Sequence, residues 1–164
     1  MKILYFGGQK SGKSNLAEKK ALELSKNKKP FYIATYDNSF QDIEMKTRID
    51  KHQNSRKDKF TTIEETKELS KVIKEKETYL IDCISMWIFN NLYKNEEELI
   101  KQLEVLENCD TNIVFVLNEV TKGVIPLDKD SRRFVDLTGI IGQKLTKICD
   151  EVYEVKFGLT NRLK

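Results

Sequence analysis

The residues with the clearest chemical signature lie near the start of the chain. Residues 7–14 read G-G-Q-K-S-G-K-S and match the pattern G-x-x-x-x-G-K-[ST] at every fixed position. In this pattern the glycines let successive backbone N–H groups turn toward a phosphate, the lysine reaches the β- and γ-phosphates, and the serine hydroxyl can ligate Mg²⁺. A glycine-rich turn with a solvated lysine would show the same letters. The flanking elements decide between these two interpretations.

The flanking sequence favours the phosphate-binding interpretation. Residues 3–6, I-L-Y-F, are an apolar run of β-forming residues, which predicts a short buried strand. From Ser14 the apolar residues recur at helical spacing, which predicts a helix that begins near Lys13 and presents its positive dipole end to a bound anion. A strand, a glycine loop and a helix in this order predict that the ligand is a nucleotide or another polyphosphate.

Length and composition exclude several classes of protein. The chain has 164 residues, 39% hydrophobic and 34% charged, which fits one globular domain spanning residues 1–164. Its 29 basic and 26 acidic residues nearly balance and form no dense basic stripe, which argues against a nucleic acid partner. No apolar run approaches the roughly 20 residues of a membrane span. The three cysteines form no C-x-x-C pair, so we expect buried thiols and a cytoplasmic location. The first predicted strand begins at once, so we expect no targeting segment.

Strands alternate with helices along the rest of the chain. We predict buried strands at residues 31–35, 78–84, 112–117 and 151–155, a short strand or extended link at 60–63, and an edge strand at 157–164. Helices are predicted at residues 42–56, 64–75, 85–92, 96–106 and 132–149, the last capped by Ser131. This alternation predicts an α/β fold of the P-loop NTPase type, in which helices flank a mainly parallel central sheet in three layers.

Two residues outside the loop could take part in the chemistry. Asp82 ends a predicted strand, where an acid suits an Mg²⁺ ligand or a nucleotide contact, or alternatively caps the next helix. His52 is the only histidine, and Arg48 and Arg56 lie one helical turn before and after it. A neutral imidazole is a competent nucleophile toward phosphorus, but a histidine on a polar helix can equally be only solvated. The spacing leaves the alternatives open for both residues.

Nearly the whole chain resembles the bifunctional adenosylcobinamide kinase/adenosylcobinamide-phosphate guanylyltransferase family of cobalamin biosynthesis. The resemblance rests on the phosphate-binding loop, on R-I-x-x-H at residues 48–52, and on N-E-V followed by G-x-x-P within residues 118–126. The chain departs from the family at three places. R-P-x-x-W is replaced by R-K-D-K-F at residues 56–60, and Thr121 stands where the family has a glycine after N-E-V. The C-terminus departs most, and its role is open.

The resemblance implies two activities. As a kinase, the family transfers the γ-phosphate of ATP or GTP to the aminopropanol hydroxyl of adenosylcobinamide. As a guanylyltransferase, it attacks the α-phosphate of GTP with a histidine, here His52, releases pyrophosphate, and passes GMP to adenosylcobinamide phosphate to give adenosylcobinamide-GDP. The resemblance also implies Mg²⁺, a corrinoid substrate and a homo-oligomer, with a trimer as the expected form.

Motif position and the resemblance together assign the candidate site. His52 and Lys13 are the catalytic candidates, and Ser14 and Asp82 are the Mg²⁺ candidates. The nucleotide-binding candidates are Gly7, Gly8, Gln9, Lys10, Ser11, Gly12, Lys13, Ser14, Ala34, Thr35, Tyr36, Gln53, Asn54, Ser55, Arg56, Glu64 and Asp82.

Several interpretations stay open from the sequence. Glu64 could instead be the first acid of a helix, and residues 118–126 with Arg132 could face the corrinoid, another subunit or only solvent. Two other functions are also open: a kinase for a different small hydroxylated metabolite, and a non-enzymatic nucleotide-binding module.

Overall fold

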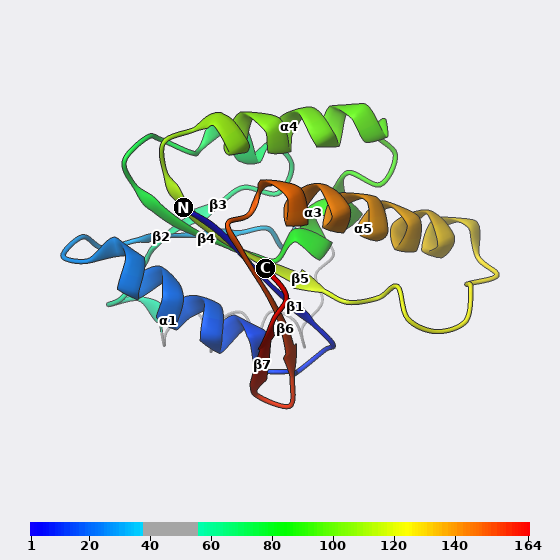
Figure 1. The fold of residues 1–164 in the computed structure, drawn as a ribbon. Helices are drawn as coiled ribbons and strands as arrows, with labels where there is room; N and C mark the ends of the chain where they lie inside the picture. The colour runs from blue at the N-terminus through cyan, green and yellow to red at the C-terminus, as the bar shows by residue number, and fades with distance from the viewer. Residues whose placement is uncertain (38–55) are drawn as a thin grey trace.

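The computed structural model describes residues 1–37 and 56–164 (Figure 1). Within this part of the chain seven strands form one sheet in the order β3-β2-β4-β5-β1-β6-β7. All neighbouring strands are parallel except β6 and β7, which are antiparallel. The predicted, mainly parallel sheet is therefore confirmed. The strands are β1 (Lys2–Gly7), β2 (Phe31–Ala34), β3 (Thr61–Glu64), β4 (Thr78–Asp82), β5 (Asn112–Asn118), β6 (Glu151–Lys156) and β7 (Leu159–Arg162).

Helices cover both faces of the sheet. Figure 1 shows α1 on one face and α3, α4 and α5 on the other, so the three predicted layers are present. Successive side chains of β1 point to opposite faces of the sheet, so this strand contributes to the core on each face. Ile3 packs in one core with Ala17 of α1, and Leu4 packs in the other core with Leu137 of α5. The helices are α1 (Lys13–Ser25), α3 (Ile84–Asn90), α4 (Glu96–Asn108) and α5 (Lys129–Ile148).

Residues 64–75 do not form the predicted helix. Glu64 is instead the last residue of β3, so its interpretation as a helix-start acid is wrong. Only Leu69–Lys71 adopt helical geometry, as the short 3₁₀ turn η2. The apolar spacing did identify a buried residue, because Leu69 is fully buried, but it did not identify the backbone conformation.

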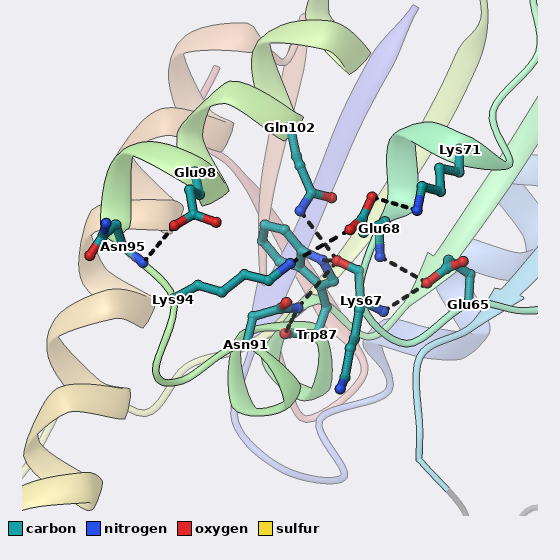
Figure 2. Close-up of polar contacts among 10 residues, drawn as sticks. All are labelled: Glu65, Lys67, Glu68, Lys71, Trp87, Asn91, Lys94, Asn95, Glu98 and Gln102. Atoms are coloured by element: carbon teal, nitrogen blue, oxygen red, sulfur yellow. Dashed lines mark hydrogen bonds and ion pairs between the residues drawn. The ribbon is translucent and has the colours of Figure 1, made fainter.

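Side chains from α3 and α4 hold this segment in its irregular conformation (Figure 2). The backbone carbonyl of Lys67 accepts hydrogen bonds from Trp87 Nε1 at 2.9 Å, Asn91 Nδ2 at 3.3 Å and Gln102 Nε2 at 3.3 Å. Glu65 Oε1 accepts from two backbone N–H groups that follow it, each at 2.8 Å. These partners satisfy backbone groups that a helix would otherwise pair, so the tertiary contacts outweigh the local propensity.

Two further expectations need correction. Helix α5 begins at Lys129, and its N-cap is Asp128, whose carboxylate accepts a hydrogen bond from Ser131 N at 2.7 Å. Ser131 is therefore inside the helix and does not cap it. All three cysteines are free, but only Cys149 is fully buried.

Among the described residues no helix is both long and apolar enough to cross a membrane.

Candidate active site

The strand, loop and helix predicted for the phosphate-binding motif are present as β1, residues 8–12 and α1. The loop turns through Lys10 and Gly12, which both have positive φ, and Ser11 N donates to Gly8 O at 3.2 Å. Its Ser11 hydroxyl is buried and has no hydrogen-bond partner within the described part of the chain. A phosphate oxygen would satisfy this hydroxyl.

The start of α1 is suited to an anion. Within the described residues its N-cap makes no side-chain hydrogen bond, and the first turn carries no acidic residue. The first N–H groups and the positive end of the helix dipole are therefore available to a phosphate. Lys13 is buried and donates from Nζ to Gly8 O at 3.1 Å. Burial lowers the pKa of Lys13, while the nearby Asp82 opposes this shift.

Asp82 is the last residue of β4, and β5 lies between β4 and β1 in the sheet. Helix α1 packs across all three strands. The Ser14 hydroxyl donates to Asp82 Oδ1 at 3.5 Å. Cys83, not Asp82, is the N-cap residue of α3, so the structure does not support a capping role for Asp82. The Asp82 carboxylate faces the loop helix, as a metal ligand at this position would require.

The donor set of Ser14 and Asp82 fits Mg²⁺. A hydroxyl and a carboxylate are the hard oxygen ligands that Mg²⁺ prefers, and this ion commonly keeps several waters and binds substrate phosphates. The described residues contain no cluster of three or more His, Cys, Asp or Glu that could hold a metal alone. An Mg²⁺ ion here would therefore depend on nucleotide phosphates and water for its remaining ligands.

A buried cluster orients Asp82 from the side opposite Ser14. Tyr32 of β2 donates from its hydroxyl to Asp82 Oδ2 at 3.1 Å, and Arg56 Nη2 lies 3.7 Å from the same oxygen. Burial raises the pKa of Asp82 above its ordinary value, while the Arg56 charge and the Tyr32 hydrogen bond oppose this shift. One carboxylate oxygen is thus held by the cluster while the other faces Ser14.

Arg56 is fixed inside the protein by three neighbours. Its Nε donates to Glu18 Oε1 at 2.6 Å, and its guanidinium lies 4.1 Å from the centre of the Tyr32 ring, in addition to the Asp82 contact. Sequence reasoning selected Arg56 and Asp82 but missed Glu18 and Tyr32. Glu18 could have been found, because it lies four residues after Ser14 and so shares a face of α1 with it.

Three predicted residues meet at the carboxyl edge of the sheet. Ala34 ends β2 in register with Glu64 of β3 and Asp82 of β4. Thr35, which follows Ala34, is buried, and its hydroxyl donates to Cys83 O at 2.7 Å and accepts from Cys83 N at 3.0 Å. The Thr35 hydroxyl therefore ties β2 to β4. The half-buried Tyr36 comes next.

His52, Gln53, Asn54 and Ser55 lie outside the described residues, as does the predicted helix at residues 42–56 apart from its last residue, Arg56. Their assignments stay predictions.

The N-E-V segment begins with the last residue of β5 and lies directly beside the phosphate-binding loop. Glu119 N donates to Gly7 O at 2.9 Å. Thr121 donates from its N to Glu119 Oε1 at 2.9 Å. A cavity of about 230 Å³ opens next to these residues and is also lined by Gly139 and Gln143 of α5. Glu119 thus contacts the phosphate-binding loop, and Asn118, Glu119 and Thr121 line a cavity next to it.

Arg132 has a local role in the structure. Its Nη1 donates to the backbone carbonyl of Pro126 at 3.1 Å and to that of Leu127. These bonds fix the end of the loop against the first turn of α5.

Comparison with known proteins identifies the family of this chain. A model of the family described as cobinamide kinase/cobinamide phosphate guanyltransferase matches residues 3–163. The chain is 34% identical over 173 residues to the bifunctional adenosylcobalamin biosynthesis protein CobP of Pseudomonas aeruginosa, covering 100% of this chain and 98% of that one. It is 30% identical over 186 residues to the bifunctional adenosylcobalamin biosynthesis protein CobU of Escherichia coli, covering all of both chains.

Solved structures share the fold at low sequence identity. The flagellar accessory protein FlaH from Methanocaldococcus jannaschii superposes with a TM-score of 0.54 at 16% identity, covering 99% of this chain and 77% of that one. A second solved structure, an ATPase domain, gives a TM-score of 0.50 at 10% identity, covering 93% and 68%. These likenesses concern the fold alone. The family match and the relatives, both spanning nearly the full length, show more: this chain belongs to the cobinamide kinase/cobinamide phosphate guanyltransferase family, whose members are bifunctional enzymes of adenosylcobalamin biosynthesis.

Proposed function

We propose that one nucleotide site in this chain serves both reactions of the family and that the second reaction passes through a GMP-histidine intermediate on His52. The observation that carries the proposal is the convergence of Lys13, Ser14 and Asp82 around the loop at the carboxyl edge of the sheet. The proposal includes adenosylcobinamide and its phosphate as substrates, Mg²⁺, and a cytoplasmic location.

In the kinase reaction the aminopropanol hydroxyl oxygen of adenosylcobinamide attacks the γ-phosphorus. The bond from that phosphorus to the β–γ bridging oxygen breaks, the hydroxyl proton passes to water, and a nucleoside diphosphate leaves with the bond's electron pair. Lys13 and the N–H groups of the loop stabilise the negative charge that grows on the leaving diphosphate. Ser14 and Asp82 would hold Mg²⁺, which neutralises phosphate charge when bound.

In the guanylyl transfer an imidazole nitrogen of His52 attacks the α-phosphorus of GTP. The α-phosphorus to bridging-oxygen bond breaks, pyrophosphate leaves, and a P–N bond to GMP forms. A phosphate oxygen of adenosylcobinamide phosphate then attacks the same phosphorus and the P–N bond breaks. The product is adenosylcobinamide-GDP and the imidazole is restored. Lys13 contacts the departing pyrophosphate in this step.

Labelling with α-³²P GTP and Mg²⁺ tests the histidine step. We expect a protein-bound label that is lost in acid, because P–N bonds hydrolyse there, and that is absent from His52→Ala. The same variant should still transfer γ-phosphate to adenosylcobinamide. An unlabelled wild-type chain, or a His52→Ala variant labelled equally, would overturn the intermediate. Transfer of γ-phosphate only to unrelated acceptors would favour a kinase for another metabolite.

We also propose that the chain works as a homo-oligomer, with a trimer as the expected form. Support comes from the loop before α5, where Val124, Ile125 and Leu127 expose large apolar side chains to solvent. Sedimentation velocity should give a single oligomeric species for the wild-type chain and a smaller one for Ile125→Glu. A monomeric wild-type chain would overturn this part of the proposal.

A further inference from the structure

The C-terminal hairpin packs on the phosphate-binding loop. Strand β6 runs parallel to β1 with Val155 opposite Gly7, and the antiparallel β7 leads back from a two-residue turn made of Phe157 and Gly158. Both turn residues have positive φ, at 53° and 81°, as the tight hairpin turns of type I′ require. Figure 1 shows the hairpin, in orange and red, beside the first turn of α1.

Both fixed glycines of the phosphate-binding motif face this hairpin. A Cβ atom on Gly7 would lie 2.2 Å from the backbone oxygen of Val155, and one on Gly12 would lie 3.3 Å from Gly158 Cα. Gly158 N also donates to Ser11 O at 2.8 Å. The hairpin therefore approaches the loop backbone so closely that a side chain at either glycine would meet it.

The hydrogen bond from Gly158 fixes the orientation of one peptide group in the loop. The Ser11 carbonyl and the Gly12 N–H belong to the same trans peptide, so they point in opposite directions. Because Gly158 holds the carbonyl toward the hairpin, the Gly12 N–H points away from the hairpin. Glycine accepts either sign of φ at little cost, so without this bond the peptide group could rotate.

Strand β7 and the turn contribute little to the hydrophobic core, whereas β6 places Val152 and Val155 in it. All four residues of β7 are exposed, and so is the side chain of Phe157 at the turn. A strand that buries so little apolar surface has a small stabilising role, yet its turn makes a defined hydrogen bond to the loop. Its position is better explained by the loop than by the core.

We propose that Gly158 is a positioning residue of the nucleotide site, which orients the Ser11–Gly12 peptide so that the Gly12 N–H donates to a phosphate of a nucleoside di- or triphosphate. The proposal rests on the proposed function only in requiring that this loop binds a nucleotide. It assigns a role to the C-terminal hairpin in preorganising the loop before the ligand arrives.

Binding of GDP with Mg²⁺ to the full chain, measured by calorimetry, tests the proposal. Gly158→Ala disfavours φ near +81° and should raise the Kd for GDP about tenfold or more, the loss expected for one hydrogen bond to a charged group. Gly158→Asn keeps the N–H and tolerates left-handed backbone, so it should restore most of the affinity. Thr160→Ala, on the exposed β7 strand, is the matched control and should bind GDP like the wild type.

The outcomes separate this proposal from the proposed function. If Gly158→Ala lowers the nucleotide-free melting temperature but leaves the Kd unchanged, the residue is only structural and the proposal is overturned. If the wild-type chain does not bind GDP, the nucleotide site itself is wrong.

A second measurement needs no variant. In wild-type protein labelled with ¹⁵N-glycine, the Gly12 amide resonance should move downfield on GDP binding, and the Gly158 amide should be protected from hydrogen exchange. A Gly12 resonance that does not respond to GDP would overturn the proposal even if Gly158→Ala fails to fold.

Discussion

Replacing Arg56 by methionine tests whether one cation holds together the cluster behind the phosphate-binding loop. Arg56 lies 2.6 Å from Glu18 and 3.7 Å from Asp82, and it stacks on the Tyr32 ring. Methionine keeps much of the apolar stem but removes the charge. The carboxylates of Glu18 and Asp82, whose side chains are 20% and 14% exposed, would then share a largely buried site without their common partner.

The structure sets the expected magnitude. Removing one partner of a buried ion pair costs about 3–5 kcal/mol, because the remaining charge is left uncompensated. Glu18 keeps enough exposure to be partly rehydrated, so the lower end, about 3 kcal/mol, is expected for Arg56→Met. For a chain of this length that corresponds to a fall in Tm of roughly 6–12 °C. Adding Glu18→Gln should recover part of the loss, because it removes one of the unpaired charges.

Urea unfolding of the nucleotide-free protein at pH 7, followed by far-UV circular dichroism, measures this cost. Lys71→Met is the matched control, because Lys71 pairs with Glu68 at a similar distance, 2.9 Å, with side chains 68% and 42% exposed. This exposed pair should contribute little to stability, because water and salt screen its charges. If Arg56→Met costs no more than Lys71→Met, the cluster does not depend on Arg56 as argued.

Three further variants probe the same region. Burial raises the pKa of Asp82, so the folded protein binds this proton more tightly than the unfolded chain and loses stability as pH rises above the ordinary value of 3.8. Asp82→Asn should therefore be more stable than wild type at pH 7 in urea titrations, and this difference in unfolding free energy should narrow toward pH 4. The same variant should lose γ-phosphate transfer. A gap that widens toward pH 4 would contradict this sign. Gly7→Ala places a Cβ 2.2 Å from the Val155 oxygen and should cost about 1–3 kcal/mol in thermal unfolding and abolish GDP binding in calorimetry; unchanged binding would show that β1 and β6 can separate freely. Thr35→Val removes the hydroxyl that bridges both backbone groups of Cys83 and should cost about 1–3 kcal/mol in urea unfolding; wild-type stability would mean that the bridge is dispensable.

Local features of the chain could be predicted from the sequence because their causes are local. The loop at residues 7–14 depends on glycine conformations and on the strand and helix next to it, all within a short window of sequence. The parallel sheet followed from apolar runs alternating with helical periodicity. The placement of Asp82 beside Ser14 followed from the same fold, since parallel strands end at one edge of the sheet.

Features that depend on distant partners could not be predicted. The conformation of residues 64–68 depends on hydrogen-bond donors from α3 and α4, and the local spacing of apolar residues gives no sign of these donors. The cluster around Arg56 joins side chains from α1, β2 and β4, which meet only once the strand order is known. The packing of Gly158 on Ser11 likewise requires that β6 pair with β1.

The proposed pair of reactions places a specific demand on the loop. One reaction breaks the bond at the γ-phosphorus and the other breaks a bond at the α-phosphorus, so the attacking group changes while the phosphates must stay in place. A loop that shifted with each attacking group would lose the alignment on which both displacements depend. This loop is held on two sides: Arg56, Tyr32 and Asp82 lie behind Ser14, and the C-terminal hairpin holds Ser11. A loop held on both sides would keep the phosphates in place for either attacking group, as the proposed single nucleotide site requires, and the C-terminal hairpin supplies one of these two supports.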